Sequence, residues 1–449
     1  MTLFSSPSGG RHCCRSLLIL LLFVLLCAVN PPAGCATPVE FEAVLQEAMT
    51  RSFALKIAQS DIALRRIELK EAASAYLPTL NLRYDFGYSW ALDGQGGVVS
   101  VGDSVSTDAD STWQNSLSAS LGLLLFDFGA RAQKMAQSRH RISAAELSRA
   151  EAVHQLRRRT LDLMTEGLLA QRRLRALAAM TRLRKELFHT REQLQAAGTI
   201  GKVELQETAL QLAADLMAED DQRLALEQAF LALTALTGAV YPSATVEFMP
   251  LPEPGGTEIV IASEELPQLR IFDEELARLH AERSAVRREM LPSLALTGNY
   301  RLYGADQGSP GRTLGELENR DAGVGLVLRW ELYSGGRDRL KLARLEEERQ
   351  RVTLQRQERA AELQQEIGSL QQALRAYQGG AEHRRARCEA LAEVVDASER
   401  LGRQGLIDRA ALIERAIAAQ QQELEMEVLD LQRRAEALRL RFWQEEVGS

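Results

Sequence analysis

The residue types best suited to catalysis or metal binding are few in this chain and do not group together. Five histidines occur after residue 35, and no two have the spacing of metal ligands: His140, His154, His189, His280 and His383. Cys388 is the only cysteine in the same region, so neither an internal disulfide nor a Cys-based zinc site is available. No HExxH, GxSxG or phosphate-binding glycine loop occurs. We therefore predict a protein that is not an enzyme, with no metal, no cofactor and histidines on helix surfaces.

Polar side chains near residue 80 instead alternate with apolar ones. In 80–90 the even positions are leucine or aromatic, whereas the odd positions include Asn81, Arg83 and Asp85. A second stretch, 117–125, alternates leucine and alanine with serine and glycine. A period of two residues predicts β-strands that have one apolar and one polar face.

The same alternation occurs in the second half of the chain, in 294–302 and 324–332. The polar positions there include Arg329 and Glu331. Loops rich in Gly, Asp and Ser join the partners of each pair, at 91–114 and 304–320. About 9–11 residues is the length of a strand that crosses a membrane at a tilt. The four segments are therefore predicted to be membrane strands.

Three short landmarks appear twice in the same order, which indicates an internal duplication. Each landmark in the first half has its counterpart in the second: Leu-Pro at 77–78 and 291–292, Phe-Asp-Phe-Gly-Ala-Arg at 126–131 and Leu-Tyr-Ser-Gly-Gly-Arg at 332–337, and the Gly-x-Ile turns at 198–201 and 405–408. The first repeat is predicted to span 37–237 and the second 263–443, with a proline- and glycine-rich linker at 238–262.

The two repeats are predicted to have the same internal order. Each begins with a helix, at about 40–76 and 263–290, followed by a β-hairpin, at 79–127 and 293–333, and a long helical hairpin, at 130–236 and 337–443. Apolar residues recur there in steps of three, four or seven, so neighbouring helices should pack side by side as in coiled coils. Helix 130–197 alone would extend roughly 100 Å at about 1.5 Å per residue.

Composition agrees with a mainly helical chain and excludes several classes of protein. Proline and aromatic residues are sparse, and charged residues make up 26% of the chain. Lys and Arg number 54 against 61 Asp and Glu, a formal net charge of −7, so nucleic acid is not an expected partner. No segment after the N-terminal region is apolar enough for a transmembrane helix.

The N-terminal residues 1–35 are predicted to be a secretory signal peptide. Arg11 and Arg15 precede an apolar run at 17–29, which is shorter than the about 20 residues of a spanning helix. Cleavage is expected near 34–36. Pro-Ala-Gly before Cys35 resembles a bacterial lipobox, although Pro32 departs from its leucine, so acylation of Cys35 is an alternative to cleavage after Ala36.

Four strands are too few to close a barrel, for which about eight is the lower limit. Open strand edges are not tolerated in lipid, because each unpaired backbone group costs several kcal/mol. If the strands enter a membrane, copies of the chain must therefore assemble. A dimer would already reach eight strands.

In the order and doubling of these landmarks, the chain resembles the TolC-like outer-membrane efflux family over about 37–443. The resemblance implies a fold that is mainly α with membrane β. Duplicated helical hairpins form an α-barrel tunnel, and four strands contribute to a trimeric 12-stranded β-barrel. It also implies a homotrimer in the outer membrane of a Gram-negative bacterium, in contact with its lipids. The helices would lie in the periplasm and dock onto a periplasmic adaptor and an inner-membrane pump.

The resemblance also assigns functional positions. The periplasmic tip would be formed by the two helix turns: Gly198, Ile200 and Gly201 in the first copy, and Gly405, Ile407 and Asp408 in the second. The aperture candidates are acidic residues just after these turns: Glu414, Glu204 and Glu207. The polar strand positions would face the barrel lumen: Asn81, Arg83, Asp85, Arg329 and Glu331.

Two other functions share parts of this pattern. The outer-membrane channel of a type I protein secretion system would have the same architecture, and the sequence does not separate protein export from drug or metal efflux. A periplasmic coiled-coil adaptor would share the export signal and helical hairpins. It would have one hairpin flanked by soluble β-domains, instead of two copies with membrane-length strands.

Overall fold

A computed structural model describes residues 37–89, 99–101, 104–106, 112–241, 246–253, 266–306 and 319–447. The predicted signal peptide with Cys35, most of the two predicted strand loops and much of the linker lie outside these residues. Within the described part of the chain, no helix is both long and apolar enough to cross a membrane.

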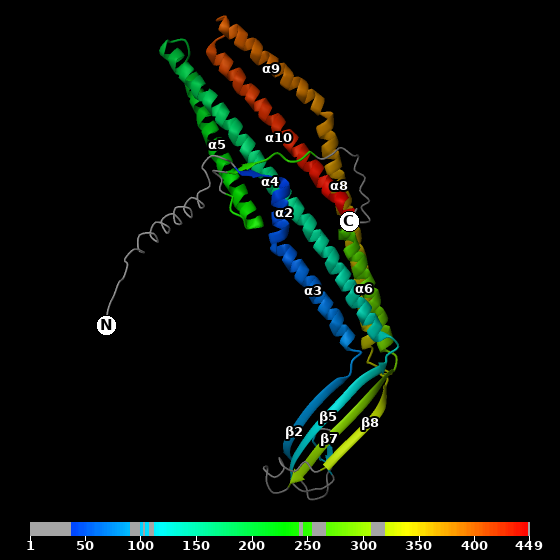
Figure 1. The fold of residues 1–449 in the computed structure, drawn as a ribbon. Coiled ribbons are helices and arrows are strands. Elements are labelled where there is room, and N and C mark those ends of the chain that lie inside the picture. Colours follow the sequence, from blue (N-terminus) through cyan, green and yellow to red (C-terminus); the bar gives the residue numbers. More distant parts are fainter. Residues whose placement is uncertain are drawn as a thin grey trace, which may run out of the picture. The chain divides into compact units, whose positions relative to one another are not determined.

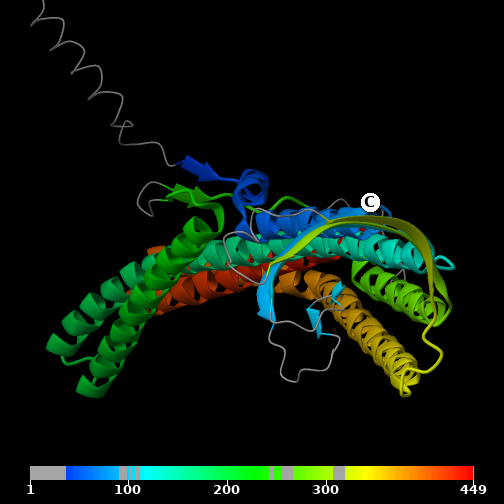
Figure 2. The ribbon, with the colours of Figure 1, turned by 90° about the horizontal axis from the view of Figure 1, so that it is seen from below.

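The four predicted strands form one antiparallel sheet in the order β2-β5-β7-β8 (Figure 1). The members are β2 (Thr79–Ser89), β5 (Thr112–Phe126), β7 (Ser293–Asp306) and β8 (Asn319–Arg329). Each hairpin comes from one repeat, and pairing of β5 with β7 joins them. The sheet is strongly twisted and curved (Figure 2), as expected for long antiparallel strands. A short separate hairpin, β3 (Val99–Val101) with β4 (Ser104–Ser106), lies between β2 and β5 in the sequence.

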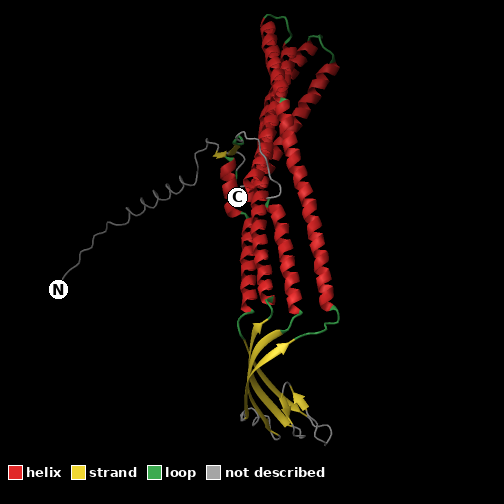
Figure 3. Ribbon diagram, turned by 90° about the vertical axis from the view of Figure 1, so that its right-hand side faces the viewer, coloured by secondary structure: helices red, strands yellow, loops and turns green. Residues whose placement is uncertain are grey.

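The remaining elements are almost all helices, and each strand of the sheet is directly followed or preceded by one (Figure 3). The helices are α2 (Phe41–Arg51), α3 (Phe53–Ser74), α4 (Ala130–Ala196), α5 (Lys202–Thr237), α6 (Pro267–Glu289), α8 (Arg337–Gly379), α9 (Ala381–Arg403) and α10 (Arg409–Val447). The helical hairpin of each repeat is present, which confirms the predicted mainly helical fold with duplicated long hairpins.

Two predicted helices are interrupted. Ser52 separates α2 from α3, and Gly380 separates α8 from α9. Gly379 and Gly380 are adjacent, and glycine is a poor helix former because it loses the most backbone entropy. The Arg384 guanidinium folds over Gly380 and donates a hydrogen bond to the carbonyl oxygen of Tyr377, at 2.6 Å. A Cβ at position 380 would collide with this guanidinium.

Contacts divide the chain into two compact units, and both repeats contribute to each. The turn unit holds the described residues within 1–52, 156–258 and 370–442, and the sheet unit holds those within 53–155, 259–369 and 443–449. Long helices such as α4 run continuously from one unit into the other. The compact units therefore do not coincide with the sequence repeats.

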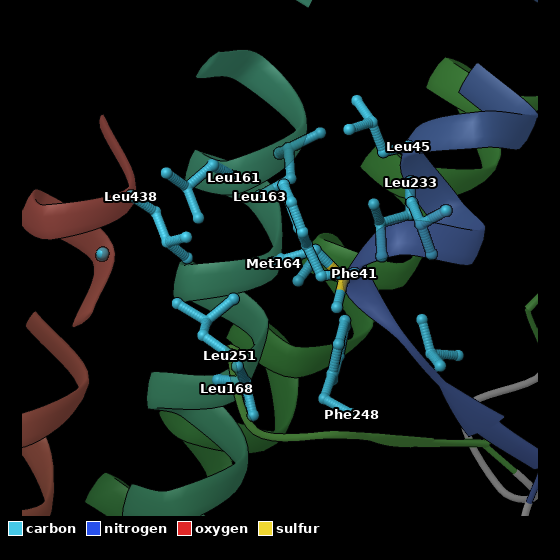
Figure 4. Packing of buried hydrophobic residues seen from close by; sticks show 14 of the residues in the cluster. Phe41, Leu45, Leu161, Leu163, Met164, Leu168, Leu233, Phe248, Leu251 and Leu438 are labelled. Carbon is cyan, nitrogen blue, oxygen red and sulfur yellow. The ribbon is translucent and has the colours of Figure 1, made fainter. Parts of the chain in front are cut away.

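The main apolar core lies in the turn unit around a small parallel strand pair. Strand β1 (Thr37–Val39) pairs with β6 (Val246–Phe248), which falls inside the predicted linker and was not expected as a strand. The Phe248 ring stacks on Phe230, with ring centroids 4.6 Å apart, and packs among leucines of α4 (Figure 4). Gln171 of α4 accepts a hydrogen bond from the backbone N–H of Phe248, at 2.9 Å. The linker strand is thus fastened to the middle of α4.

Gly167 of α4 lies directly under the Phe248 ring, and a Cβ at that position would overlap the ring. We expect Gly167→Ala to lower the free energy of unfolding by about 1–3 kcal/mol, because overpacking forces the ring or helix to move. The measurement is the thermal unfolding midpoint of detergent-solubilised protein. Gly368→Ala is the matched control, since no neighbour lies within 4 Å of a Cβ there and alanine favours a helix by up to about 1 kcal/mol. Equal midpoints for the two variants would contradict the assigned packing.

Candidate functional site

The register of the sheet gathers the predicted polar positions on one face. Asn81 is level with Ser120, Asn299 and Gly323 across the four strands. Arg83 is level with Ser118, Arg301 and Asp321, and Asp85 with Ser116, Tyr303 and Asn319. Because side chains alternate between faces along a strand, these rows share a single surface, on which Arg329 also lies opposite Ser293. Most side chains on the polar face are small or carry a hydroxyl group, and the charged side chains lie in a few of the rows.

The opposite face is mainly apolar on all four strands, with Asn115 and Arg320 as polar positions near the loop end of the sheet. Rows such as Leu82, Ala119, Tyr300 and Ala322, or Leu123, Leu296 and Leu326, continue across the sheet. Many of these side chains are open to solvent in a single chain, and Leu82 is 73% exposed. A contiguous apolar surface of this extent marks a site for lipid or for another protein.

Glu331 does not lie on the polar face as expected, because β8 ends at Arg329. The partner strand β7 begins at Ser293, directly after Pro292, so no backbone partner remains for residues beyond Arg329. Glu331 lies in the connection to α8, where its two carboxylate oxygens accept hydrogen bonds from the Arg337 guanidinium at 3.1 and 3.0 Å.

The connection from β5 to α4 is held by one largely buried ion pair. Asp127 accepts hydrogen bonds from the backbone N–H of Gly129 and of Arg131, at 3.1 and 2.8 Å, and from the Arg131 guanidinium, at 3.0 Å. Arg131 also donates to the carbonyl oxygen of Ala75, at 3.0 Å, and lies over the Tyr76 ring. Burial raises the pKa of Asp127, but these hydrogen bonds and the Arg131 charge outweigh it, so the pKa lies below its ordinary value.

The two predicted turns have the same backbone geometry. Gly198 and Gly405 are left-handed, with φ of 76° and 71°. In each turn, the backbone N–H of the residue after this glycine donates a hydrogen bond to the carbonyl oxygen five residues earlier. The bonds are Thr199 to Leu194 and Leu406 to Leu401, both at 3.0 Å. This is the Schellman ending of a helix, in which glycine is favoured because other residues are strained at positive φ. The sequence match between the turns thus reflects an identical way of ending α4 and α9.

Acidic residues after the two turns are brought together by a residue that sequence inspection missed. Arg191 of α4 donates hydrogen bonds to the Glu414 carboxylate of α10 and to Thr208 Oγ1 of α5, the latter at 2.6 Å. The Glu204 carboxylate lies 3.6 Å from the same guanidinium. Arg191 is largely buried, whereas the two glutamates are about half exposed. Glu207 is exposed and lies outside this cluster. One arginine among many on α4 gave no distinguishing signal in the sequence.

The histidine prediction is wrong for one residue. His154 is 2% exposed and packs on Trp443, and its Nδ1 lies 3.2 Å from the Glu446 carboxylate. Its environment comes from the far end of the chain, which local sequence does not reveal. In the described ranges, no group of three or more His, Cys, Asp or Glu residues is arranged to hold a metal ion.

Asp127→Asn should lower the free energy of unfolding at neutral pH by about 2 kcal/mol, because charge-assisted hydrogen bonds are lost. A carboxyl group with a depressed pKa stabilises the fold above its unfolded pKa of about 3.9, and this contribution is lost as the pH falls through the folded value. The difference from wild type should therefore be constant from pH 7 to about pH 5, begin to shrink at about pH 4, and disappear only when the pH has fallen below the depressed folded pKa. Thermal unfolding over this pH range tests the expectation, with exposed Asp61→Asn as control. A difference independent of pH would contradict the role of the charge.

Comparison with known proteins shows which of them this chain is similar to in sequence and in fold. Residues 44–239 match the family model described as outer membrane efflux protein, whereas no curated protein matches the chain in sequence. In its fold the chain is similar to CusC, with 14% identity, a TM-score of 0.73 and coverage of 93% of this chain and 95% of that one. VceC of Vibrio cholerae is 15% identical, with a TM-score of 0.70 and coverages of 91% and 96%.

The Campylobacter jejuni outer-membrane channel CmeC has the same fold at 14% identity, with a TM-score of 0.71 and coverages of 91% and 85%. VceC is an outer-membrane protein and CmeC an outer-membrane channel, and the matching family model describes efflux proteins, so the comparisons agree with the prediction that the chain is not an enzyme. The first repeat thus matches the outer membrane efflux protein family model, and the fold of nearly the whole chain is similar to that of CusC.

Proposed function

We propose that the protein is the outer-membrane channel of a tripartite efflux system. Three copies would form one 12-stranded β-barrel and one helical tunnel, which receives small toxic compounds or ions from an inner-membrane pump through a periplasmic adaptor. The observation that carries the proposal is the four-stranded sheet with an apolar face and two unpaired edges. The helices, with the turns at Gly198 and Gly405, would lie in the periplasm.

The sheet order explains why copies would join edge to edge. The first and last strands, β2 and β8, run antiparallel to one another because three successive antiparallel pairings connect them. The β8 edge of one copy can therefore pair antiparallel with the β2 edge of the next, and rotation closes the ring. Closure of the ring would give the backbone N–H and C=O groups along both edges hydrogen-bond partners within the hydrocarbon layer. The apolar face would then contact lipid, and the row of Asn81, Arg83 and Asp85 would face the lumen.

Helix α5 in the turn unit carries an unpartnered apolar seam. Five side chains recur every seven residues, and each is more than half exposed: Val203, Leu210, Met217, Leu224 and Leu231. A straight α-helix drifts about 20° per heptad, so a strict seven-residue repeat indicates packing against a supercoiled neighbouring helix. The neighbour is absent from a single chain, which supports assembly with further copies.

Helix α3 in the sheet unit shows the same feature independently. Phe53, Ile57, Leu64 and Ile67 follow coiled-coil spacing on its surface, and each is more than half exposed. This helix leads directly into the edge strand β2. A copy that pairs with the β2 edge would thus also be positioned to cover α3.

Substitution of the α5 seam tests the assembly. Leu210→Gln with Leu224→Gln should reduce the fraction of trimer in mild detergent, because two apolar contacts of roughly 1–2 kcal/mol each are lost from every seam. Leu210→Met with Leu224→Met is the matched control and should keep the trimer. Mass measurement by light scattering distinguishes the states. A wild-type protein that remains a monomer would reject the proposed channel, whereas a dimer would retain a barrel and reject the stoichiometry.

The Arg191 cluster is proposed to line the narrowest point of the tunnel through Glu204 and Glu414. Rings of carboxylates in a pore favour cations. Glu414→Gln should therefore lower the cation preference in planar bilayers, whereas Arg191→Gln should raise it by uncovering two carboxylates. Glu207→Gln serves as a comparison outside the cluster. Reversal potentials that do not change in opposite directions for Glu414→Gln and Arg191→Gln would show that the cluster is a structural contact remote from the aperture.

A further inference from the structure

A cleft of about 230 Å³ lies where the sheet meets the helices of the sheet unit. Its strand residues include Leu124, Ser293 and Arg329. Leu124 is level with Ala295, and Ser293 with Arg329, so all of these side chains belong to the polar face of the sheet. The cleft therefore opens on the polar side, at the end of the sheet from which the helices begin.

The carboxylates that line the cleft are already neutralised by neighbouring cations. Asp127 is bonded to Arg131 at 3.0 Å, and Glu289 lies 2.5 Å from Lys134 Nζ. Glu331 accepts both of its hydrogen bonds from Arg337. Each acidic side chain of the cleft thus has a positively charged partner.

Two further guanidiniums line the same cleft without such a partner. Arg288 donates one hydrogen bond to the backbone carbonyl oxygen of Gly129, at 3.1 Å, which leaves its charge uncompensated. Arg329 on β8 is exposed. Among the residues that the structure describes, neither arginine forms an ion pair with a carboxylate. A guanidinium has five N–H donors in a planar fork that matches carboxylate and phosphate oxygens.

We propose that this cleft is an oxyanion-binding site, in which Arg288 and Arg329 bind a phosphate or carboxylate group of a compound in transit through the lumen. The inference rests on the proposed channel and concerns the class of compound that it conducts. Paired acidic groups and two unpaired guanidiniums give each cleft a local positive charge. The site would retain anionic groups at the passage from the helical tunnel into the barrel and would favour organic anions over cations there.

The test is block of the purified wild-type channel in planar bilayers by inorganic pyrophosphate, at constant ionic strength. Pyrophosphate should reduce the conductance, and Arg288→Gln or Arg329→Gln should each raise the half-blocking concentration about ten-fold, as expected for loss of a charge-assisted contact. Arg329→Lys should retain part of the block, because charge remains while the planar fork is lost. Arg51→Gln removes the same charge outside the cleft and should leave the block unchanged.

An unaltered half-blocking concentration in both Gln variants, or an equal change in Arg51→Gln, would overturn the site and mean that the guanidiniums are neutralised within the assembly. Absence of block in the wild-type channel would overturn it as well. A wild-type protein that forms no conductance at all would instead count against the proposed function, so the two failures are distinguishable.

Discussion

Backbone hydrogen bonding along the outer edges of β2 and β8 is the constraint on which the other features depend. Within the sheet, every strand-to-strand pairing is made by a single chain, and the order β2-β5-β7-β8 leaves the two outer edges open. Such edges are tolerated in water but not in hydrocarbon, where no solvent replaces the missing partner. A sheet of this kind with an apolar face is stable in a membrane only when further strands complete it.

Two helices, like the edges of the sheet, have surfaces that no other part of the described chain covers. The seams of α5 and α3 are apolar, regularly spaced and exposed, whereas the central core of the turn unit is fully packed around Phe248. A chain that folded for itself alone would have little reason to keep these side chains at coiled-coil spacing on its surface. The chain thus has its own core and also regularly spaced apolar surfaces that are left exposed.

The two predicted repeats differ at their strand-to-helix connections and within their helical hairpins. The first strand-to-helix connection is fixed by buried Asp127 and Arg131, whereas Tyr333 stands at the aligned position of the second repeat and Arg337 pairs with exposed Glu331. The first hairpin has one continuous outgoing helix, α4, and the second is interrupted at Gly380. The outgoing helix is therefore interrupted only in the second of these two hairpins. The Arg191 cluster connects the halves again near their turns.

The amino-acid sequence by itself determined the features that depend on local periodicity. Alternation in 80–90 and 324–329 specifies strands and the faces that they present, and glycine at 198 and 405 specifies where helices end, because only glycine adopts positive φ without strain. Only the tertiary structure decided the pairing of β5 with β7, the strand formed by the linker, the end of β8 at Arg329 and the burial of His154. It also brought Arg191 to Glu414, and Arg288 and Arg329 to one cleft. These relations join residues far apart in the chain, and their geometry follows from how whole helices and strands pack, which no local pattern encodes.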